Sequence, residues 1–328
     1  MKFQLEINIP CLTTPIKYTD NILLIGSCFT EHMADRLSQH RFRVLSNPHG
    51  ILFNPLSVAS SLDSYLNGKL YTEGDLFYLN ELWNSWEHHT RFSDIDAEKA
   101  LQQINETQAA AGGMIEKADW IMITLGSAFQ YYLKDGDKPV ANNHRAPGQW
   151  FEKKLLTIAE ITGVLSNTLC LLQQKNPKAK VLFTISPVRH IRDGVVDNNR
   201  SKARLIEAVH ELCCQFSFAH YFPAYELVMD ILRDYRFFDV DFVHPNYAAT
   251  SFVWEEFVKA CIDPDTAKLM KEVLEINAAQ NHRPRFPETQ AHQEFCRKYY
   301  EKAFNLQKQF PFLDLKESIL YLSSPIQG

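Results

Sequence analysis

The chain has no apolar run long enough to cross a membrane and no block of basic residues. A membrane helix needs about 20 consecutive apolar residues, and binding to nucleic-acid phosphates needs clustered Lys and Arg. With a net charge of −5, the composition argues against nucleic acid and membrane as partners. Glu6 interrupts what would be the apolar core of a signal peptide, so we expect a cytoplasmic protein.

The seven cysteines are spread along the chain, and no two of them have the CxxC spacing of a zinc or redox motif. Their odd number also argues against a disulfide framework. No glycine-rich motif that cradles phosphates is present. We therefore expect no metal and no organic cofactor, and we expect most thiols to be buried as small hydrophobic side chains. Nothing in the pattern indicates an oligomeric state.

What the chain does contain is an alternation of strand and helix patterns. Its 328 residues, 45% of them apolar, suffice for one large domain with an appendage. Short apolar runs at Ile22–Ile25, Trp120–Leu125 and Lys180–Ile185 predict buried strands, and amphipathic helical patterns lie between them. This order predicts an α/β fold with a mostly parallel, doubly wound sheet and helices on both faces.

The alternation ends near Asp263, and only helical patterns follow. We therefore expect residues 1–264 to form the α/β domain and residues 265–328 to form a helical extension packed on it. Aromatic residues with a short period near 70–94, and a turn signal within 128–145, predict two inserted hairpins.

The first predicted strand ends at Gly26, and two nucleophile-type residues, Ser27 and Cys28, follow it directly. An amphipathic helical pattern begins at Phe29. A strand, a tight turn and a helix N-terminus place a thiol or hydroxyl where backbone N–H groups point outward. We expect this position to lower the pKa of the Cys28 thiol, whereas Ser27 would need a base to activate it.

A second constellation lies near residue 240, where Asp241 and His244 stand three residues apart. An imidazole can serve as general base, and a carboxylate can orient it through its other ring nitrogen. Asp239 is close enough in the chain to compete with Asp241 for that role. Nucleophile, base and orienting carboxylate are thus all present in the sequence.

The order of these blocks resembles the SGNH hydrolases, also called GDSL-like esterases, and more narrowly the GSCFA family, a bacterial group within that superfamily. Gly26–Phe29 matches the naming motif, with Thr30 in place of its final Ala. The blocks Asn47–Pro55, Trp86–Ser93, Ser186–His190 and Val243–Pro245 are also similar to those of the family. The resemblance implies a three-layer α/β/α sandwich and ester chemistry, either hydrolysis or acyl transfer.

The resemblance also implies roles for individual residues. The superfamily motif Gly-Asp-Ser places its nucleophile on Cys28, although a shift of one residue would place it on Ser27. His244 resembles the base, and Asp241 resembles its carboxylate partner. The Cys28 N–H and the Gly50 N–H resemble two donors of the oxyanion hole.

One expected donor of the superfamily is missing, because the chain reads Gly126-Ser127-Ala128 where an Asn would follow the middle strand. The candidates to replace it are Ser127, Asn54, Asn142 and Asn143. We expect substrate contacts from further polar residues that follow strands or lie in loops: His89, Asn143, His144, Arg189 and His190. For His88 and His89, a solvated loop is the alternative to a sugar-type pocket.

The sequence therefore predicts an esterase or acyltransferase that acts on a small-molecule or glycan ester through a Cys (or Ser)-His-Asp triad. The alternative is a non-catalytic binding module that keeps the fold, which the missing Asn favours. The scattered His and Asp positions argue against a metal-dependent hydrolase.

Overall fold

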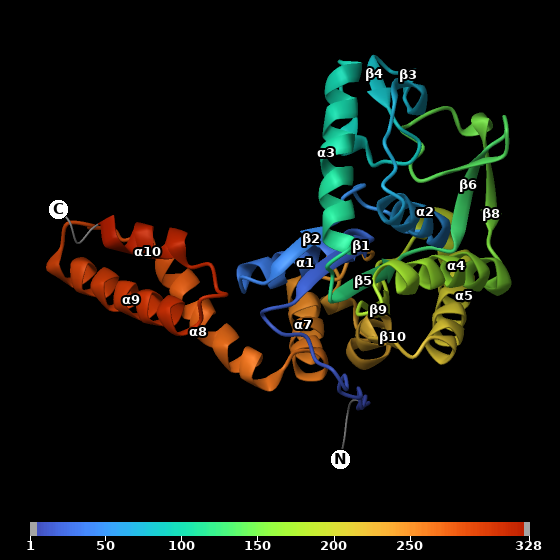
Figure 1. Cartoon of the computed structure of the whole chain (residues 1–328). Helices are drawn as coiled ribbons and strands as arrows, with labels where there is room; N and C mark the ends of the chain where they lie inside the picture. Colours follow the sequence, from blue (N-terminus) through green and yellow to red (C-terminus); the bar gives the residue numbers. More distant parts are fainter. Residues whose placement is uncertain (1–4, 325–328) are drawn as a thin grey trace. The chain divides into compact units, whose positions relative to one another are not determined.

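The computed structural model describes residues 5–324, and its central feature is a five-stranded sheet (Figure 1). The strand order is β10-β9-β5-β1-β2. The pairs β1–β5, β5–β9 and β9–β10 are all parallel. The strands are β1 (Asn21–Gly26), β2 (Arg43–Ser46), β5 (Trp120–Leu125), β9 (Lys180–Ile185) and β10 (Ala219–Tyr221).

The long helices lie between these strands in the chain or, for the last of them, after β10, as the alternating pattern predicts. They are α1 (Cys28–Gln39), α2 (Pro55–Leu66), α3 (Ala97–Ile115), α4 (Ile158–Lys175), α5 (Gly194–Gln215) and α7 (Tyr247–Cys261). Shorter elements are η1 (Glu73–Asp75), η2 (Thr90–Phe92), η3 (Gly148–Trp150), η4 (Ile191–Asp193), α6 (Ala224–Glu226), the π-helix η5 (Leu227–Leu232) and η6 (Tyr235–Phe237).

Helices cover both faces of the sheet because successive strand side chains point to opposite sides. Leu23 and Ile121 belong to a buried cluster that includes side chains from α2, α3, α4 and α5. Leu24 points the other way and lies with Met33 of α1 and Phe257 of α7. The fold is thus a three-layer α/β/α sandwich, as predicted.

Two small antiparallel sheets are inserted into this unit. The hairpin of β3 (Phe77–Leu79) and β4 (Leu82–Asn84) falls in the first predicted insertion. The second insertion has three strands, β6 (Phe129–Leu133), β7 (Lys138–Val140) and β8 (Phe151–Leu155). We did not predict β8, because its sequence Phe-Glu-Lys-Lys-Leu is too polar to indicate a buried strand.

The chain divides into two compact units that do not follow one sequence boundary. The first contains 21–34, 44–257 and the described residues 5–10. The second contains 11–20, 35–43 and the described residues from 258 onward. The helical end of the chain therefore forms a unit together with two segments from the N-terminal part, which the sequence pattern did not indicate.

Three helices dominate the second unit: α8 (Pro264–Asn281), α9 (Gln290–Gln309) and α10 (Lys316–Ser323). We did not predict α10. Arg41 links two of them, because its guanidinium donates to the side chains of Asn277 and Gln280 on α8 and of Ser318 on α10. Ile16 forms an isolated parallel bridge with Ile262 just before α8.

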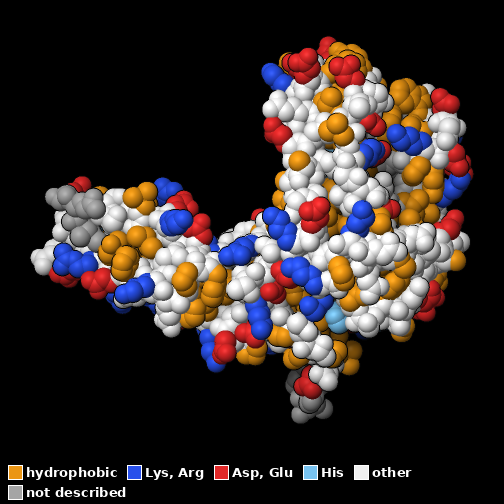
Figure 2. All heavy atoms as spheres, in the orientation of Figure 1, with side chains coloured by type: hydrophobic (Ala, Val, Ile, Leu, Met, Phe, Trp, Pro, Cys, Tyr) orange, Lys and Arg blue, Asp and Glu red, His pale blue; other side chains and the backbone are white. Residues whose placement is uncertain are grey.

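Lys and Arg side chains are interspersed with Asp and Glu over the face shown in Figure 2. Within residues 5–324, no helix combines the length and the apolar character that crossing a bilayer requires.

The bend between β1 and α1 depends on a glycine. Gly26 has a φ of +150°, and a Cβ built there would lie 2.2 Å from the carbonyl oxygen of Thr124 on β5. The same Thr124 oxygen accepts a hydrogen bond from the Ser27 N–H at 3.2 Å. The backbones of β1 and β5 can therefore approach so closely only because residue 26 has no side chain.

We expect Gly26→Ala to lower the free energy of unfolding by at least roughly 2 kcal/mol, because the added methyl group meets a backbone that cannot move away. Gly113→Ala in α3 is the matched control, since a Cβ there meets no atom within 4 Å. In the control, helix propensity should stabilise the protein by roughly 0.5–1 kcal/mol. Urea unfolding followed by circular dichroism measures both. Equal effects in the two variants would contradict this account.

Candidate active site

The two candidate nucleophiles lie at the carboxyl end of β1, where α1 begins. Ser27 is buried, and its Oγ has no hydrogen-bond partner among the described residues. Cys28 is only partly buried and is the first residue of α1. Of the two, Cys28 is therefore the more accessible to a substrate.

The Cys28 thiol is less acidic than its position at a helix N-terminus predicts. Burial raises its pKa, and the Glu31 carboxylate raises it further. The backbone N–H groups of Phe29 and Cys28 and the ammonium of Lys202 act in the opposite direction but do not outweigh burial. The predicted lowering of this pKa was thus wrong, because removal from water destabilises the thiolate more than the N–H groups at the start of α1 stabilise it.

His244 and Asp241 form a closely bonded pair on the turn before α7. His244 Nδ1 lies 2.6 Å from Asp241 Oδ2. The hydrogen bond from His244 is the largest cause that lowers the pKa of Asp241, to about 2, and the N–H groups of His244 and Val243 add to it. Among the residues that the structure describes, Asp239 contributes only backbone contacts to this turn, so Asp241 is the carboxylate that faces the imidazole.

Arg189 holds this turn against the loop that follows β9. Its N–H donates to the carbonyl of Val243 at 3.3 Å, and its Nη1 donates to the carbonyl of Phe242 at 3.1 Å. Its guanidinium also lies 4.3 Å from the ring centroid of Phe238. The structure thus places Arg189 as a support of the His244 turn.

His190 lies beside the ends of β1 and β5. A Cβ built on Gly126 would lie 3.2 Å from His190 Nε2 and 3.4 Å from the Cβ of Ser27. Burial lowers the pKa of His190 to about 4, and the charges of Lys202 and His244 contribute to this lowering. These contacts place Ser27, Gly126 and His190 together and His244 within electrostatic reach. Among the described residues, no hydrogen bond joins the Cys28 thiol to His244.

Lys202 on α5 is a buried lysine beneath this edge of the sheet. Only 1% of the residue is exposed, and its Nζ donates to the carbonyls of Gly126 at 2.7 Å and Ser186 at 2.6 Å. Burial lowers its pKa to about 7, although the charge of Cys28 raises it. We did not predict that Lys202 is buried, because a lysine in an amphipathic helical pattern is usually exposed. The sequence signal that could have shown it is the spacing from Asn198 and Leu205, which puts all three residues on the same buried face of α5.

The structure places the expected oxyanion donors as follows. The Gly50 N–H donates to the carbonyl of Asn47 at 2.7 Å and is therefore already engaged. Asn54 caps α2, because its Oδ1 accepts from the Ser57 N–H at 2.9 Å. Ser127 Oγ accepts from the N–H of Phe129 at 3.1 Å.

Asn47 has a free donor in the same region. Its Oδ1 accepts from the Gly26 N–H at 2.9 Å, which fixes the amide group against the bend. Its Nδ2 is buried and has no partner among the residues that the structure describes. Buried donors rarely remain unpaired, so this amide is available to a bound group.

The three remaining residues that we expected to contact the substrate make contacts with other parts of the protein. The N–H of His89 donates to the carbonyl of His49, and the charge of Glu31 on α1 acts on the His89 imidazole. His144 is buried, and its Nε2 lies 2.7 Å from the carbonyl of Ser85. For Asn143, the structure gives a backbone contact alone, from the N–H of Ala146. No contact among the described residues brings Asn143 or His144 to Cys28.

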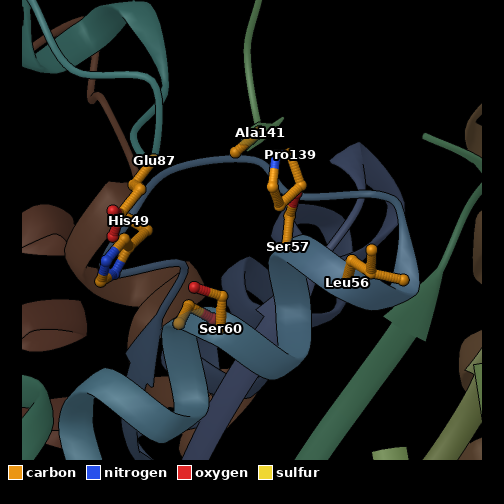
Figure 3. Close-up of a pocket in the computed structure, with 8 residues that line it drawn as sticks. His49, Leu56, Ser57, Ser60, Glu87, Pro139 and Ala141 are labelled. Carbon is orange, nitrogen blue, oxygen red and sulfur yellow. The ribbon is translucent and has the colours of Figure 1, made fainter. Parts of the chain in front are cut away.

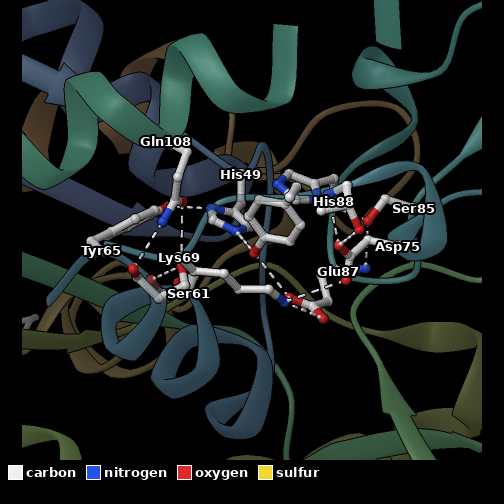
Figure 4. A network of polar contacts seen from close by, with 12 residues as sticks. His49, Ser61, Tyr65, Lys69, Asp75, Ser85, Glu87, His88 and Gln108 are labelled. Carbon is white, nitrogen blue, oxygen red and sulfur yellow. Dashed lines mark hydrogen bonds and ion pairs between the residues drawn. The ribbon is translucent and has the colours of Figure 1, made fainter. Parts of the chain in front are cut away.

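A buried polar network lies behind the loop that carries Asn47 and Gly50 (Figure 4). His49 Nε2 lies 3.0 Å from the hydroxyl of Tyr71, and its Nδ1 lies 2.5 Å from that of Tyr65. The Tyr71 hydroxyl donates to Glu87, which also pairs with Lys69 at 2.8 Å. Burial lowers the pKa of His49 to about 3, so its ring is neutral at pH 7.

A cavity of about 30 Å³ adjoins this network, with His49 and Glu87 on one side and Ser57 and Ser60 of α2 on another (Figure 3). That volume suits one or two water molecules and no organic substrate. The network therefore fixes the loop from within, and the candidate site lies at the sheet edge instead.

The chain is thus a three-layer α/β protein with a nucleophile-type bend and a His–Asp pair at one edge of its sheet. The model of the GSCFA family matches residues 21–257, and that of the "GSCFA domain protein, C-terminal domain" matches residues 273–328. The chain belongs to the GSCFA family.

Among solved structures, the chain is similar to an acetyl xylan esterase (Est2A) from the rumen bacterium Butyrivibrio proteoclasticus. The identity is 10% and the TM-score is 0.34. The match covers 75% of this chain and 64% of the esterase chain, which is less than two thirds of that protein's length. No curated protein matches.

The buried Lys202 predicts a pH-dependent stability. A lysine whose pKa is about 7 when folded and about 10.4 when unfolded binds more protons in the unfolded state between these values. Its destabilising effect is therefore full below pH 7 and disappears as the pH rises toward 10.4. We expect the stability of Lys202→Met relative to wild type to fall by on the order of 3 kcal/mol from pH 7 to pH 10.

Urea unfolding at several pH values measures this difference. The matched control is Lys178→Met, which removes an exposed lysine paired with Asp119. A difference between Lys202→Met and wild type that stays constant over this pH range would contradict a lowered pKa for Lys202.

Proposed function

We propose that the protein is an SGNH-like esterase or O-acyltransferase with Cys28 as nucleophile, His244 as base and Asp241 as the carboxylate that orients the imidazole. The observation that carries the proposal is the 2.6 Å contact between His244 and Asp241 on a turn tied to the loop after β9. The carboxyl ends of β1, β5 and β9 meet at that edge, which is where α/β sheets bind ligands.

In the proposed reaction, the Cys28 S–H proton passes to His244 Nε2 while Sγ forms a bond to the acyl carbon. The tetrahedral intermediate collapses when the C–O bond breaks and the leaving alkoxide takes the proton from His244. A thioester on Cys28 remains. Water or an acceptor hydroxyl, deprotonated by His244, then attacks the thioester carbon. The C–S bond breaks, the acid or the new ester leaves, and the thiolate takes the proton back from His244.

The raised pKa of Cys28 makes this base necessary, because a buried thiol is largely protonated at neutral pH. Asp241 fixes His244 Nδ1 as the donor, so Nε2 is left as the acceptor. For the transfer, His244 Nε2 must come within hydrogen-bonding distance of Sγ, a geometry that active sites often reach only with substrate bound.

The proposed oxyanion hole uses the N–H of Cys28 and the side-chain amide of Asn47. The first lies at the start of α1, where N–H groups have no partner within the helix. The second is held against the bend by its bond to Gly26 and has an unused Nδ2. Asn47 would replace the Asn that the superfamily carries after the middle strand.

For the substrate, we propose an ester on a carbohydrate. Three exposed aromatic residues lie close to the His–Asp pair in the chain: Tyr235 before it, Phe242 within it and Tyr247 after it. Exposed aromatic rings at a polar site can stack on sugar rings. Trp86, by contrast, stacks flat against Phe77 with 3.6 Å between ring centroids. The stacked faces of these two rings are therefore not available to a sugar ring.

The second candidate function is a ligand-binding module without catalysis. The observation that favours it is that the Cys28 thiol and His244 share no hydrogen bond among the described residues. A binding module needs the sheet edge and the exposed aromatic residues near it, but it needs no proton transfer between Cys28 and His244.

Turnover of short-chain aryl esters and of acetylated sugars tests the proposal. We expect Cys28→Ala to lower kcat by about 10³-fold or more, because no nucleophile remains. His244→Ala should lower kcat by about 10²–10⁴-fold through loss of the general base. Ser27→Ala should stay near wild type, and Cys170→Ala, an exposed thiol on α4, is the control for loss of a cysteine.

Activity that persists in Cys28→Ala but is lost in Ser27→Ala would transfer the nucleophile to Ser27. Absence of turnover with every ester, together with saturable binding of acetylated sugars by the wild type, would favour the binding module.

A further inference from the structure

The second unit has a cavity of its own, with a volume of about 540 Å³. All residues that line it belong to that unit, and they come from the end of α1, the turn after it and the C-terminal part of α8. Small-molecule sites usually have volumes of about 300–1,000 Å³. The cavity therefore has room for an organic ligand, whereas the cavity beside His49 has room only for water.

One face of α8 lines this cavity. Residues three or four positions apart lie on the same side of a helix, so four lining residues form one stripe: Leu274, Asn277, Ala278 and Asn281. The buried Ile276 lies on a different face of α8. The stripe is therefore not used for packing α8 into the unit.

Three amide side chains of the lining keep unused hydrogen-bonding capacity. Among the residues that the structure describes, the side chains of Gln39 and Asn281 make no hydrogen bond. Gln280 Oε1 accepts from the Ser318 hydroxyl at 2.6 Å and from Arg41 at 3.3 Å, whereas its Nε2 has no partner within residues 5–324. Amides both donate and accept hydrogen bonds, as the hydroxyl groups of a sugar do.

Arg41 stands at a position where glycine is usual. Its N–H donates to the carbonyl of Ser38 at 2.8 Å, and the N–H of Phe42 donates to that of Leu37 at 3.1 Å. These are the two bonds of a Schellman motif, in which the residue at the place of Arg41 has a left-handed backbone. Its φ is +64°, which glycine would adopt at lower cost. The chain therefore keeps the Arg41 side chain against the preference of its backbone, which indicates a use for it.

The protein does not saturate the Arg41 guanidinium. Its Nη2 is shared among three acceptors at 3.2 to 3.4 Å. Its Nε has no partner among the described residues. Its Nη1 lies 3.7 Å from the carboxylate of Glu317, a side chain that is 76% exposed. Donor capacity is therefore left for a bound group.

The charges around the cavity favour an uncharged ligand. Glu317 offsets Arg41, and the cavity lies at the C-terminal ends of α1 and α8, where helix dipoles place partial negative charge. An anion would meet these negative ends, and a cation would meet Arg41. A neutral molecule rich in hydroxyl groups avoids both costs, and Leu274 and Ala278 offer apolar surface to the C–H groups of a sugar ring.

We propose that this cavity binds a neutral saccharide. The amides of Gln39, Gln280 and Asn281 exchange hydrogen bonds with its hydroxyl groups, and Arg41 adds a donor held in place by α8 and α10. The site goes beyond the ester chemistry proposed above, because it gives the helical unit a binding role that involves neither Cys28 nor His244.

Isothermal titration calorimetry of the full chain with sugars that carry no ester tests this site. The neutral probes are cellotriose, xylotriose and mannotriose, and the anionic probe is trigalacturonic acid. We expect saturable binding of at least one neutral probe and weaker binding of the anionic one, because the helix ends and Glu317 oppose a carboxylate.

Three variants locate the binding. Arg41→Gly removes the guanidinium and suits the left-handed turn, and Asn281→Ala removes an unused amide. Each should weaken binding about tenfold through loss of hydrogen bonds. Ala278→Trp fills the cavity from an exposed position and should abolish binding. The matched control is Asn305→Ala, which removes an exposed amide of α9 outside the cavity and should bind like the wild type.

Unchanged binding in folded Ala278→Trp and Asn281→Ala would overturn the proposal. Failure of the wild type to bind any neutral probe, or a preference for trigalacturonic acid, would overturn it as well. Both α8 variants change exposed residues, so the result is readable even if Arg41→Gly does not fold. Since the probes contain no ester, the result is also independent of whether the protein turns over any ester.

Discussion

Gly26 passes so close to the carbonyl of Thr124 that no side chain fits between them, and this contact determines how the sheet edge is built. The bend is held from three sides. Ser27 donates to β5, the Gly26 N–H donates to Asn47, and the Gly26 carbonyl accepts from Leu52. The start of α1 therefore has one position relative to the neighbouring loops, which is what a preorganised site requires.

The electrostatics of this edge follow from its burial. Removal from water raises the pKa of Cys28 and lowers those of Lys202 and His190, so each group is shifted toward its neutral form. Asp241 is the opposite case. It remains exposed and is held ionised by hydrogen bonds, of which that from His244 is the strongest. The candidate site thus combines buried groups that are shifted toward their neutral forms with an exposed turn on which Asp241 is ionised.

The sheet could be read from the sequence because β1, β5 and β9 are continuous apolar runs that are buried on both faces. β8 escaped detection since its outward residues are charged, and α10 because its polar ends resemble a loop. The residues of the bend and of the Asp241–His244 pair could also be identified in the sequence, because the members of each group are close together in the chain.

The parts of the site that depend on tertiary structure were not readable. The acidity of Cys28 was misjudged because a sequence gives no measure of how far a side chain is removed from water. Lys202 and the free amide of Asn47 were missed, since their significance lies in partners that are distant in the chain or missing. The role of Arg189 as a support of the turn likewise depends on contacts with residues 53 and 54 positions away.

The turn that bears His244 is far more open than the thiol, with 46% of the imidazole side chain accessible. Bulk water can reach an imidazole so placed, whereas an acceptor alcohol competes only if its own bulk shields the ring from solvent. For the acyl chemistry proposed, the choice between hydrolysis and transfer would then rest with the incoming molecule. A large acceptor that screens the turn would receive the acyl group, and a small one would lose it to water.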